Sequence, residues 1–302
     1  MSTSVNSKHT PIIKWVGGKS TILDKLFNQF PTTINNYYEP FIGGGSVLFE
    51  LLKNINNGSI QLKGKIYAYD INKHLINFYK HLQTNTTLLY KYIEAFIDTY
   101  NKIQTVKGDR KPVDLDSAKK SKESFYYFMR TLFNKLDSTS IHSAALLVVI
   151  NKTCFRGLYR VNSTNTFNTP FGNYKTVNVD KHNFEYVANL IKDVHFECSD
   201  FTNSLKNVSN NTDDFIYLDP PYVPIESDSF VSYSVDGFDN DKHTSLFNIL
   251  NNDIKCKFVL SNSKTKMVEK HFEKYNQVII NCKRRINSKK PGSTTDELII
   301  YN

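Results

Sequence analysis

The 302-residue sequence has few cysteines and no long apolar stretch. Its four cysteines lie far apart without a Cys-x-x-Cys pair, which argues against a zinc site and against a disulfide framework. The longest apolar run, residues 144–150, is far too short to span a bilayer, and the first residues lack the basic region and apolar core of a secretory signal. Reduced thiols, an intracellular location and no membrane association are therefore expected.

Arginine is also scarce, although the chain is basic. The formal charge of +9 at pH 7 and the pI near 9.1 favour a polyanionic partner such as nucleic acid, but membrane-surface proteins can be as basic. The 40% of hydrophobic residues are enough for the core of one large or two modest domains. Each of the six arginines is a candidate for a specific contact: Arg110, Arg130, Arg156, Arg160, Arg284 and Arg285.

The tetrad Asp219-Pro220-Pro221-Tyr222 follows an apolar run at 215–218 that has the composition of a buried strand. Open α/β sheets place their ligands at the carboxyl ends of strands, so a site is predicted there. The two prolines hold a carboxylate and a carbonyl oxygen outward beside the tyrosine ring. Such acceptors suit a planar exocyclic amine and stabilise the positive charge that grows as it attacks an electrophile. A plain Pro-Pro turn is the alternative.

Residues 14–20, Lys-Trp-Val-Gly-Gly-Lys-Ser, end like a phosphate-binding loop. That loop needs a glycine at position 13, where the sequence has Ile13, so nucleotide hydrolysis is not favoured. The segment is instead predicted to be a glycine turn that leads into a helix over residues 21–30.

A second glycine turn, Gly43-Gly44-Gly45, lies between a predicted strand at 37–41 and a predicted helix at 47–52. Leu48 occupies the place of the third glycine of a dinucleotide fingerprint, which favours a smaller nucleoside cofactor. A further strand at 65–69 ends in Asp70, an acid at the place that commonly binds ribose hydroxyls. A helix N-cap is the alternative role for Asp70.

Residues 151–175 interleave cations and aromatic residues with turn residues, and they predict a β-hairpin or an extended loop. Such a segment can wedge between base pairs, hold phosphates and reach guanine edges in the major groove. An exposed loop with solvated lysines is the alternative.

Helices, loops and strands are predicted elsewhere as well: helices at 88–100, 122–136 and 241–250, a polar loop at 104–120, strands at 194–198, 257–260 and 298–301, a lid at 223–240, and a basic loop at 283–291. Strand and helix alternation thus stops near residue 80 and resumes after 182. These boundaries predict a discontinuous domain, residues 1–79 and 183–302, interrupted by an insert, residues 80–182.

Together, the segments 14–19, 41–46 and 219–222 resemble the Dam-type (D12 class, alpha group) DNA adenine-N6 methyltransferases, in the family's order and over nearly the whole chain. The resemblance implies an α/β, Rossmann-like S-adenosylmethionine-dependent methyltransferase domain with an inserted helical and β-hairpin target-recognition domain. It implies methyl transfer from S-adenosylmethionine to adenine flipped out of a short palindromic site in double-stranded DNA, without a metal. The catalytic residues would be Asp219, Pro220, Pro221 and Tyr222.

The resemblance also assigns the contacts to cofactor and DNA. The cofactor residues would be Trp15, Gly17, Gly18, Lys19, Glu39, Pro40, Phe41, Gly43, Gly45, Ser46, Asp70, Asp200, Phe201 and Asp219. The DNA residues would be Lys14, Phe155, Arg156, Leu158, Arg160, Pro170, Arg284, Lys289 and Lys290. By position Phe155 matches the intercalating aromatic, Leu158 the thymine contact and Arg160 the arginine on the third-base guanine.

Arg156 stands where the family usually has an asparagine. GATC is therefore the first expectation for the target, and CATG or another four-base site stays open. Cytosine-N4, RNA or protein-glutamine methylation, and a non-catalytic DNA-binding protein with this fold, are the alternatives. The resemblance is compatible with a restriction endonuclease that acts on the same site without a stable complex, with a cytoplasmic or nucleoid-associated location, and with a viral or phage origin.

Overall fold

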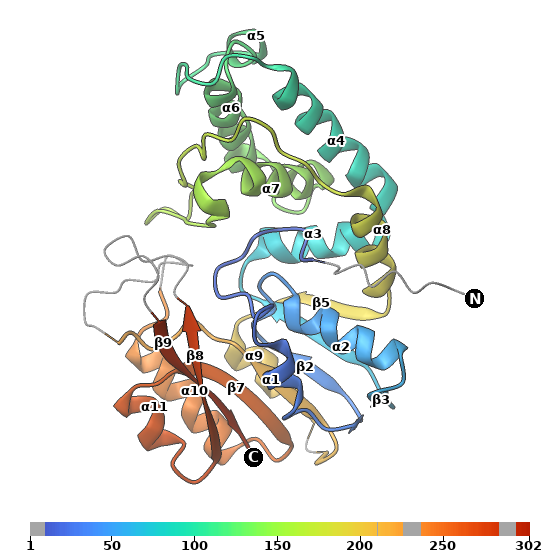
Figure 1. Cartoon of the computed structure of the whole chain (residues 1–302), viewed down its shortest axis with the longest axis vertical. Helices are drawn as coiled ribbons and strands as arrows, with labels where there is room; N and C mark the ends of the chain where they lie inside the picture. The colour runs from blue at the N-terminus through green and yellow to red at the C-terminus, as the bar shows by residue number, and fades with distance from the viewer. Residues whose placement is uncertain (1–9, 210, 226–236, 284–293) are drawn as a thin grey trace. The chain divides into compact units, whose positions relative to one another are not determined.

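The computed structural model describes residues 10–209, 211–225, 237–283 and 294–302. The chain forms two compact units (Figure 1). Unit 1 comprises Met1–Ser20, Gly43–Leu52 and Asn72–Asp193, and unit 2 comprises Thr21–Ile42, Lys53–Ile71 and Val194–Asn302. The residues expected to form the insert, 80–182, fall within unit 1. Their role as a target-recognition domain stays a prediction.

A seven-stranded sheet forms the centre of unit 2 (Figure 1). Its strands are β5 (Val194–Cys198), β4 (Ile66–Asp70), β2 (Tyr37–Glu39), β6 (Phe215–Leu218), β7 (Lys257–Ser263), β9 (Thr294–Tyr301) and β8 (Asn276–Lys283), in spatial order. The first five are parallel, and β9 runs antiparallel to both of its neighbours. The strand order reverses between β2 and β6, which is where open α/β sheets bind their ligands. The fold is thus the mixed α/β fold expected of a methyltransferase.

The core of unit 2 lies between this sheet and three helices, α9 (Phe201–Lys206), α10 (Asn240–Asn252) and α11 (Lys266–His271). All four residues of β6 are buried, because a central parallel strand is covered on both faces. The other elements of unit 2 are α1 (Leu23–Phe27) and a two-stranded parallel sheet of β1 (Thr33–Ile34) and β3 (Gln61–Leu62).

Unit 1 is helical within its described residues. Its elements are α3 (Lys73–Thr84), α4 (Thr86–Lys102), α5 (Leu115–Ala118), α6 (Lys122–Lys135), α7 (Ile141–Thr153), η1 (Phe155–Gly157) and α8 (Lys181–Leu190), together with most of α2 (Ser46–Asn56). Helix α7 packs against α3, α4 and α6, and almost all of its side chains are buried. The apolar run at 144–150 is therefore the centre of this unit, as expected of a helix that is apolar all round. No helix among the described residues is long and apolar enough to cross a membrane.

Several predicted elements are confirmed and others need correction. Strands β5 and β6 have the predicted bounds, and α4, α6 and α10 match within two residues. Strand β2 ends at Glu39, because Pro40 has no N–H to continue the ladder. Helix α1 covers only five of the ten predicted residues. After its end, the N–H groups of Gln29 and Phe30 bond to the carbonyls three residues earlier instead of four, so the α-helix does not continue.

Strands β7 and β9 are longer than predicted. β7 continues through Ser261, Asn262 and Ser263, and β9 already begins at Thr294. The three polar residues of β7 are buried, so an apolar pattern could not mark the end of that strand. The predicted loop at 104–120 contains the short helix α5. The predicted lid is described only at its two ends.

Candidate active site

The tetrad 219–222 leaves β6 at its carboxyl end, beside the end of β2. Pro220 is buried, whereas Asp219 and Tyr222 are half-buried. The hydroxyl of Tyr222 donates a hydrogen bond to Oε2 of Glu297 at 3.0 Å. The next residue, Val223, donates its N–H to Oδ1 of Asn262 at 3.0 Å. The predicted position of the tetrad at the carboxyl end of a strand is therefore confirmed, and the structure adds that the strand order reverses beside it.

Glu39, at the end of β2, is a buried acid beside this tetrad. It is 2% exposed, and the hydroxyl of Tyr37 donates a hydrogen bond to its Oε2 at 2.8 Å. Burial raises the pKa of Glu39 to about 8; the hydrogen bond from Tyr37 opposes this change, and the negative charge of Asp219 adds to it. Two carboxyl groups thus interact electrostatically at the ends of β2 and β6, and Glu39 is protonated at neutral pH.

The ends of β4 and β5 carry two further predicted cofactor residues. Asp70 is the last residue of β4, and its carbonyl accepts the N–H of Ser199 at 3.2 Å. The side chain of Asn72, not that of Asp70, caps α3, by accepting the N–H of His74 and of Leu75. The N-cap of α3 is therefore Asn72, and the alternative role of Asp70 as that cap is wrong.

Asp200 is a helix N-cap, which the sequence did not suggest. Its carboxylate accepts the N–H of Asn203 at 2.9 Å and the hydroxyl of Thr202 at 2.6 Å. Burial alone would raise the pKa of Asp200, but these hydrogen bonds outweigh burial and lower the pKa. The group is therefore an ionised carboxylate at neutral pH, held at the first turn of α9.

Three aromatic rings lie together beyond the ends of these strands. Phe41 and Phe201 stack with their ring centroids 6.0 Å apart, and Phe238 packs against both, at 5.9 and 5.4 Å. Phe41 and Phe201 were predicted as cofactor contacts, whereas Phe238 was not. No sequence pattern marks Phe238, because it lies far along the chain in a polar segment.

In unit 1 the second glycine turn lies against Trp15. Gly43 has φ +49°, and a Cβ added there would come within 2.8 Å of Cδ1 of Trp15. A Cβ on Gly44 would come within 3.0 Å of Cβ of Trp15. Only glycine allows this approach of backbone and indole, so the predicted cofactor residues Trp15 and Gly43 do lie together.

The same turn is fixed at its other end. Gly45 has φ +74°, and a Cβ there would come within 2.9 Å of the hydroxyl of Tyr79, which itself donates to the carbonyl of Gly43 at 2.9 Å. The N–H of Lys19 donates to Oγ of Ser46 at 3.1 Å, and Nζ of Lys19 donates to the carbonyl of Gly17 at 2.6 Å. Unit 1 therefore brings both glycine turns together.

Asn151, near the end of α7, connects Lys14 at the start of the chain to Gly157, in the segment 151–175 that is predicted to contact DNA. It is 3% exposed; its Oδ1 accepts the N–H of Lys14 at 2.8 Å, and its Nδ2 donates to the carbonyls of Lys14 and Gly157 at 2.8 and 3.0 Å. Gly157 has φ +67°, and a Cβ there would come within 2.6 Å of Cβ of Lys14. Sequence reasoning missed Asn151, although a lone amide that ends an apolar helix could have drawn attention to it.

The predicted hairpin is an extended loop closed by two isolated antiparallel bridges, Cys154 with Phe171 and Val161 with Phe167. Phe155 at its start is 45% exposed, and its N–H donates to the carbonyl of Pro170 at 2.8 Å. The prediction of a hairpin or extended loop is thus confirmed for the bridged segment after η1, whereas residues 151–153 belong to helix α7 and residues 155–157 form η1. Leu158, a predicted base contact, is half-buried just after η1.

Two arginines of this loop adopt notable conformations. Arg156 has φ +56°, a left-handed conformation that is unusual for a side-chain-bearing residue, and its guanidinium lies 5.2 Å from the centroid of the Phe155 ring. Arg160 is exposed, and its Nε and Nη2 donate to the side chain and the carbonyl of Asn168 at 2.7 and 3.2 Å. Since a guanidinium has five N–H groups, Arg160 keeps donors that point away from Asn168.

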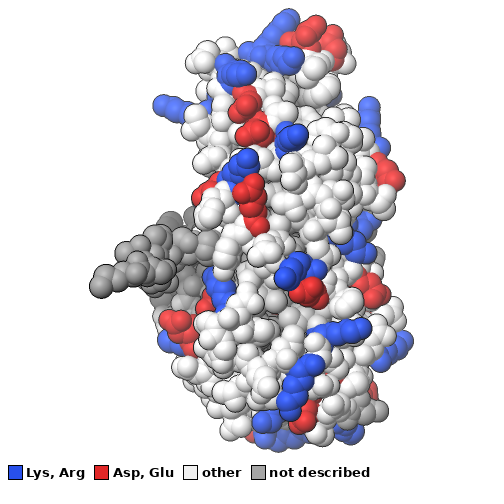
Figure 2. Space-filling model, turned by 90° about the vertical axis from the view of Figure 1, so that its right-hand side faces the viewer, with Lys and Arg blue, Asp and Glu red and all other residues white. Residues whose placement is uncertain are grey.

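Arg284, Lys289 and Lys290, predicted to contact DNA, lie outside the described residues. On the face shown in Figure 2, lysine and arginine side chains alternate with acidic ones.

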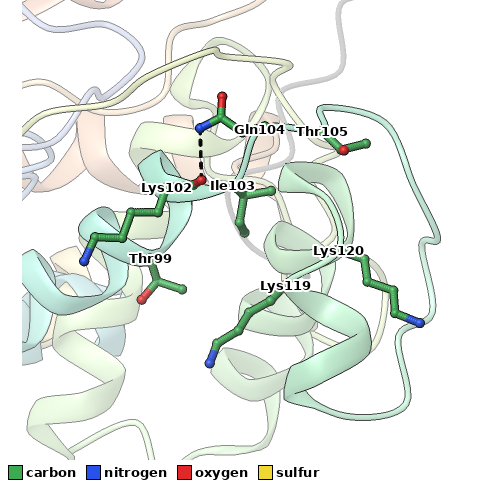
Figure 3. Close-up of a pocket in the computed structure, with 7 residues that line it drawn as sticks. All are labelled: Thr99, Lys102, Ile103, Gln104, Thr105, Lys119 and Lys120. Atoms are coloured by element: carbon green, nitrogen blue, oxygen red, sulfur yellow. Dashed lines mark hydrogen bonds between the residues drawn. The ribbon is translucent and has the colours of Figure 1, made fainter.

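A pocket of about 470 Å³ in unit 1 is lined by Thr99, Lys102, Ile103, Gln104, Thr105, Lys119 and Lys120 (Figure 3). None of the predicted site residues lines this pocket.

Comparison with known proteins places the chain in a family. The family model of the D12 class N6 adenine-specific DNA methyltransferases matches residues 15–286. The type II methyltransferase M.MjaIII of Methanocaldococcus jannaschii is 33% identical, over 97% of this chain and 98% of the relative. The type II methyltransferase M1.LlaDCHI of Lactococcus lactis subsp. cremoris is 31% identical, over 97% and 95%, and the DNA adenine methylase of Haemophilus influenzae is 28% identical, over 86% and 81%. The chain therefore belongs to the D12 class N6 adenine-specific DNA methyltransferases, which are enzymes that act on DNA.

Proposed function

We propose that the protein transfers a methyl group from S-adenosylmethionine to the N6 amine of adenine in a short palindromic duplex site, with the adenine flipped out of the helix. One observation carries this proposal. Within a chain of this family, residues 219–222 lie at the carboxyl end of β6, beside β2, where the strand order reverses.

The tetrad offers the adenine amine two hydrogen-bond acceptors and an aromatic ring. The lone pair of an adenine amine is delocalised into the ring, so two acceptors, the carboxylate of Asp219 and the carbonyl of Pro220, would favour a pyramidal nitrogen and stabilise its developing positive charge. The ring of Tyr222 gives a face for the base to stack on. An in-line displacement of this kind depends on positioning, and Asp219 need not remove a proton before the attack. Bound S-adenosylmethionine would supply the electrophilic methyl group.

The residues of unit 2 fit a positively charged nucleoside. Phe41 and Phe201 give aromatic faces for a base, Asp70 gives a carboxylate for ribose hydroxyls, and the buried Glu39 gives an acid that a cation would ionise. In unit 1 the proposed contacts are Trp15, Gly17, Gly18, Lys19, Gly43, Gly45 and Ser46. The contact of Trp15 with a turn that only glycine can form supports their joint role.

The proposed reader of the target is the loop at 151–175, within a recognition domain of residues 80–182. Phe155 is exposed where a wedge residue is needed, and Arg160 is oriented by Asn168 with donors left for guanine. Lys14 would contact the first base of GATC, while CATG or another four-base site stays open because of Arg156. Two relatives are named type II methyltransferases, which supports a partner endonuclease that acts on the same site.

The test is methylation of genomic DNA in cells that express the protein, followed by sequencing of the modified positions. Asp219→Ala should abolish transfer and leave S-adenosylmethionine binding largely in place. Asp213→Ala is the control, because Asp213 is an exposed carboxylate at the opposite end of β6. Full activity of Asp219→Ala, or methyl groups found on cytosine instead of adenine, would refute the assignment.

A further inference from the structure

The backbone that leaves the tetrad is held by β7 and β9. Tyr222 donates its hydroxyl to Glu297 of β9 at 3.0 Å, and Val223 donates its N–H to Oδ1 of Asn262 of β7 at 3.0 Å. Ser263 of β7 donates its hydroxyl to the carbonyl of Val223. Ser263 and Glu297 are direct partners in the antiparallel pairing of β7 with β9. Three side chains from one place in the sheet therefore bind two consecutive residues.

The polar side chains of β7 are unusual for their position. Asn262 is 0% and Ser263 is 3% exposed, in a strand whose preceding residues 258–260 are apolar and buried. Nδ2 of Asn262 is buried without a hydrogen-bond partner among the described residues. Burying an amide with an unpaired donor is unfavourable, so packing alone does not explain this side chain. Its bond to Val223 gives a reason for an amide at this place.

The tyrosine hydroxyl is held in one protonation state. Burial raises the pKa of Tyr222 well above its usual value, and the negative charges of Asp219 and Glu297 raise it further. The hydroxyl therefore remains a donor to the Glu297 carboxylate, and this bond anchors the hydroxyl end of the ring. Donation to a carboxylate also makes the ring richer in electrons. Such a ring attracts a stacked base more strongly as positive charge grows on that base.

We propose that Glu297, Asn262 and Ser263 form a positioning clamp for Tyr222 and Val223. The clamp would hold the tyrosine ring and the acceptors of Asp219 and Pro220 in one geometry while the amine reacts. The inference rests on the proposed function, since it concerns the same tetrad. None of the three clamp residues touches a reacting atom in this scheme, so they are positioning residues.

The test compares kcat, the KM for duplex DNA and the Kd for S-adenosylmethionine in purified full-length variants. Glu297→Ala should lower kcat by about tenfold or more, because a hydrogen bond to a charged group is lost, and it should change KM and Kd by less than about twofold. Glu297→Gln should recover much of kcat, because its amide oxygen still accepts the hydroxyl. Asp296→Asn is the control: Asp296 is the exposed neighbour on the same strand.

Tyr222→Phe gives a second, less disruptive variant, since it removes only the hydroxyl. It should lower kcat about as much as Glu297→Ala, and the double variant should lose no more than the larger single loss, because both remove the same bond. Additive losses, or a Glu297→Ala kcat equal to wild type, would overturn the clamp while leaving the proposed function intact. A wild-type protein that transfers no methyl group to duplex DNA would overturn both.

Discussion

Replacing Glu39 by glutamine should make the stability of the protein much less dependent on pH. The folded protein raises the pKa of this carboxyl from 4.5 to about 8, chiefly through burial. Above pH 4.5 the unfolded chain releases the proton while the folded chain keeps it. Stability from this group is therefore complete below pH 4.5 and is lost as the pH rises towards 8. At about 1.36 kcal/mol per unit of pKa difference, the full loss is about 4 to 5 kcal/mol.

Urea denaturation at several pH values measures this effect. The free energy of unfolding of Glu39→Gln should exceed that of wild type by an amount that grows by about 3 kcal/mol between pH 5.5 and pH 8. The amide oxygen can still accept the hydroxyl of Tyr37, so the variant should fold. Glu185→Gln, at an exposed position, should stay within about 0.5 kcal/mol of wild type throughout. A difference between Glu39→Gln and wild type that does not change with pH would refute the burial of an acid at this place.

Three further predictions concern the loop at 151–175. Arg160→Ala should lower methylation of the cognate site by about ten- to a hundredfold and of near-cognate sites much less, as measured on all four-base contexts; an unchanged preference would place recognition elsewhere. Asn151→Ala should lower the free energy of unfolding in urea by about 2 to 3 kcal/mol, since it leaves three backbone groups unpaired, and a loss no larger than that of a surface variant would contradict this. Arg156→Asn should raise that free energy by about 0.5 to 1 kcal/mol, because asparagine tolerates φ +56° better than arginine does, whereas a lower stability would show that the guanidinium contact with Phe155 outweighs the backbone.

The sequence predicted the central strands well for a physical reason. A strand such as β6 is buried on both faces, so it reads as an uninterrupted apolar run, which ends where Asp219 and Pro220 follow. The same reasoning failed for β7, where Asn262 and Ser263 are buried although they are polar. Their partner, Val223, lies far away along the chain, and no local pattern can announce a bond of that kind.

In the candidate site, too, features set by the local sequence were predicted and features set by distant residues were not. The motifs identified the glycine turns and the tetrad, because those residues are required by local backbone geometry. The protonation of Glu39, the cap formed by Asp200 and the ring of Phe238 depend on the neighbours that tertiary structure brings to them. Properties that arise from distant neighbours could not be predicted from a single sequence, however clear its motifs.

Asn151 suggests how two proposed base contacts keep a fixed spacing. Lys14 and the loop that begins at Phe155 are far apart in sequence, but one buried amide bonds the backbone of Lys14 on both sides and the carbonyl of Gly157. Gly157 in turn leaves room for the side-chain stem of Lys14. A shift of Lys14 relative to the loop would break these bonds in a place that water does not reach, which is costly. Lys14 and Arg160 would therefore contact DNA at a fixed spacing. Replacing Asn151 by alanine should weaken discrimination at the first base and at the guanine together.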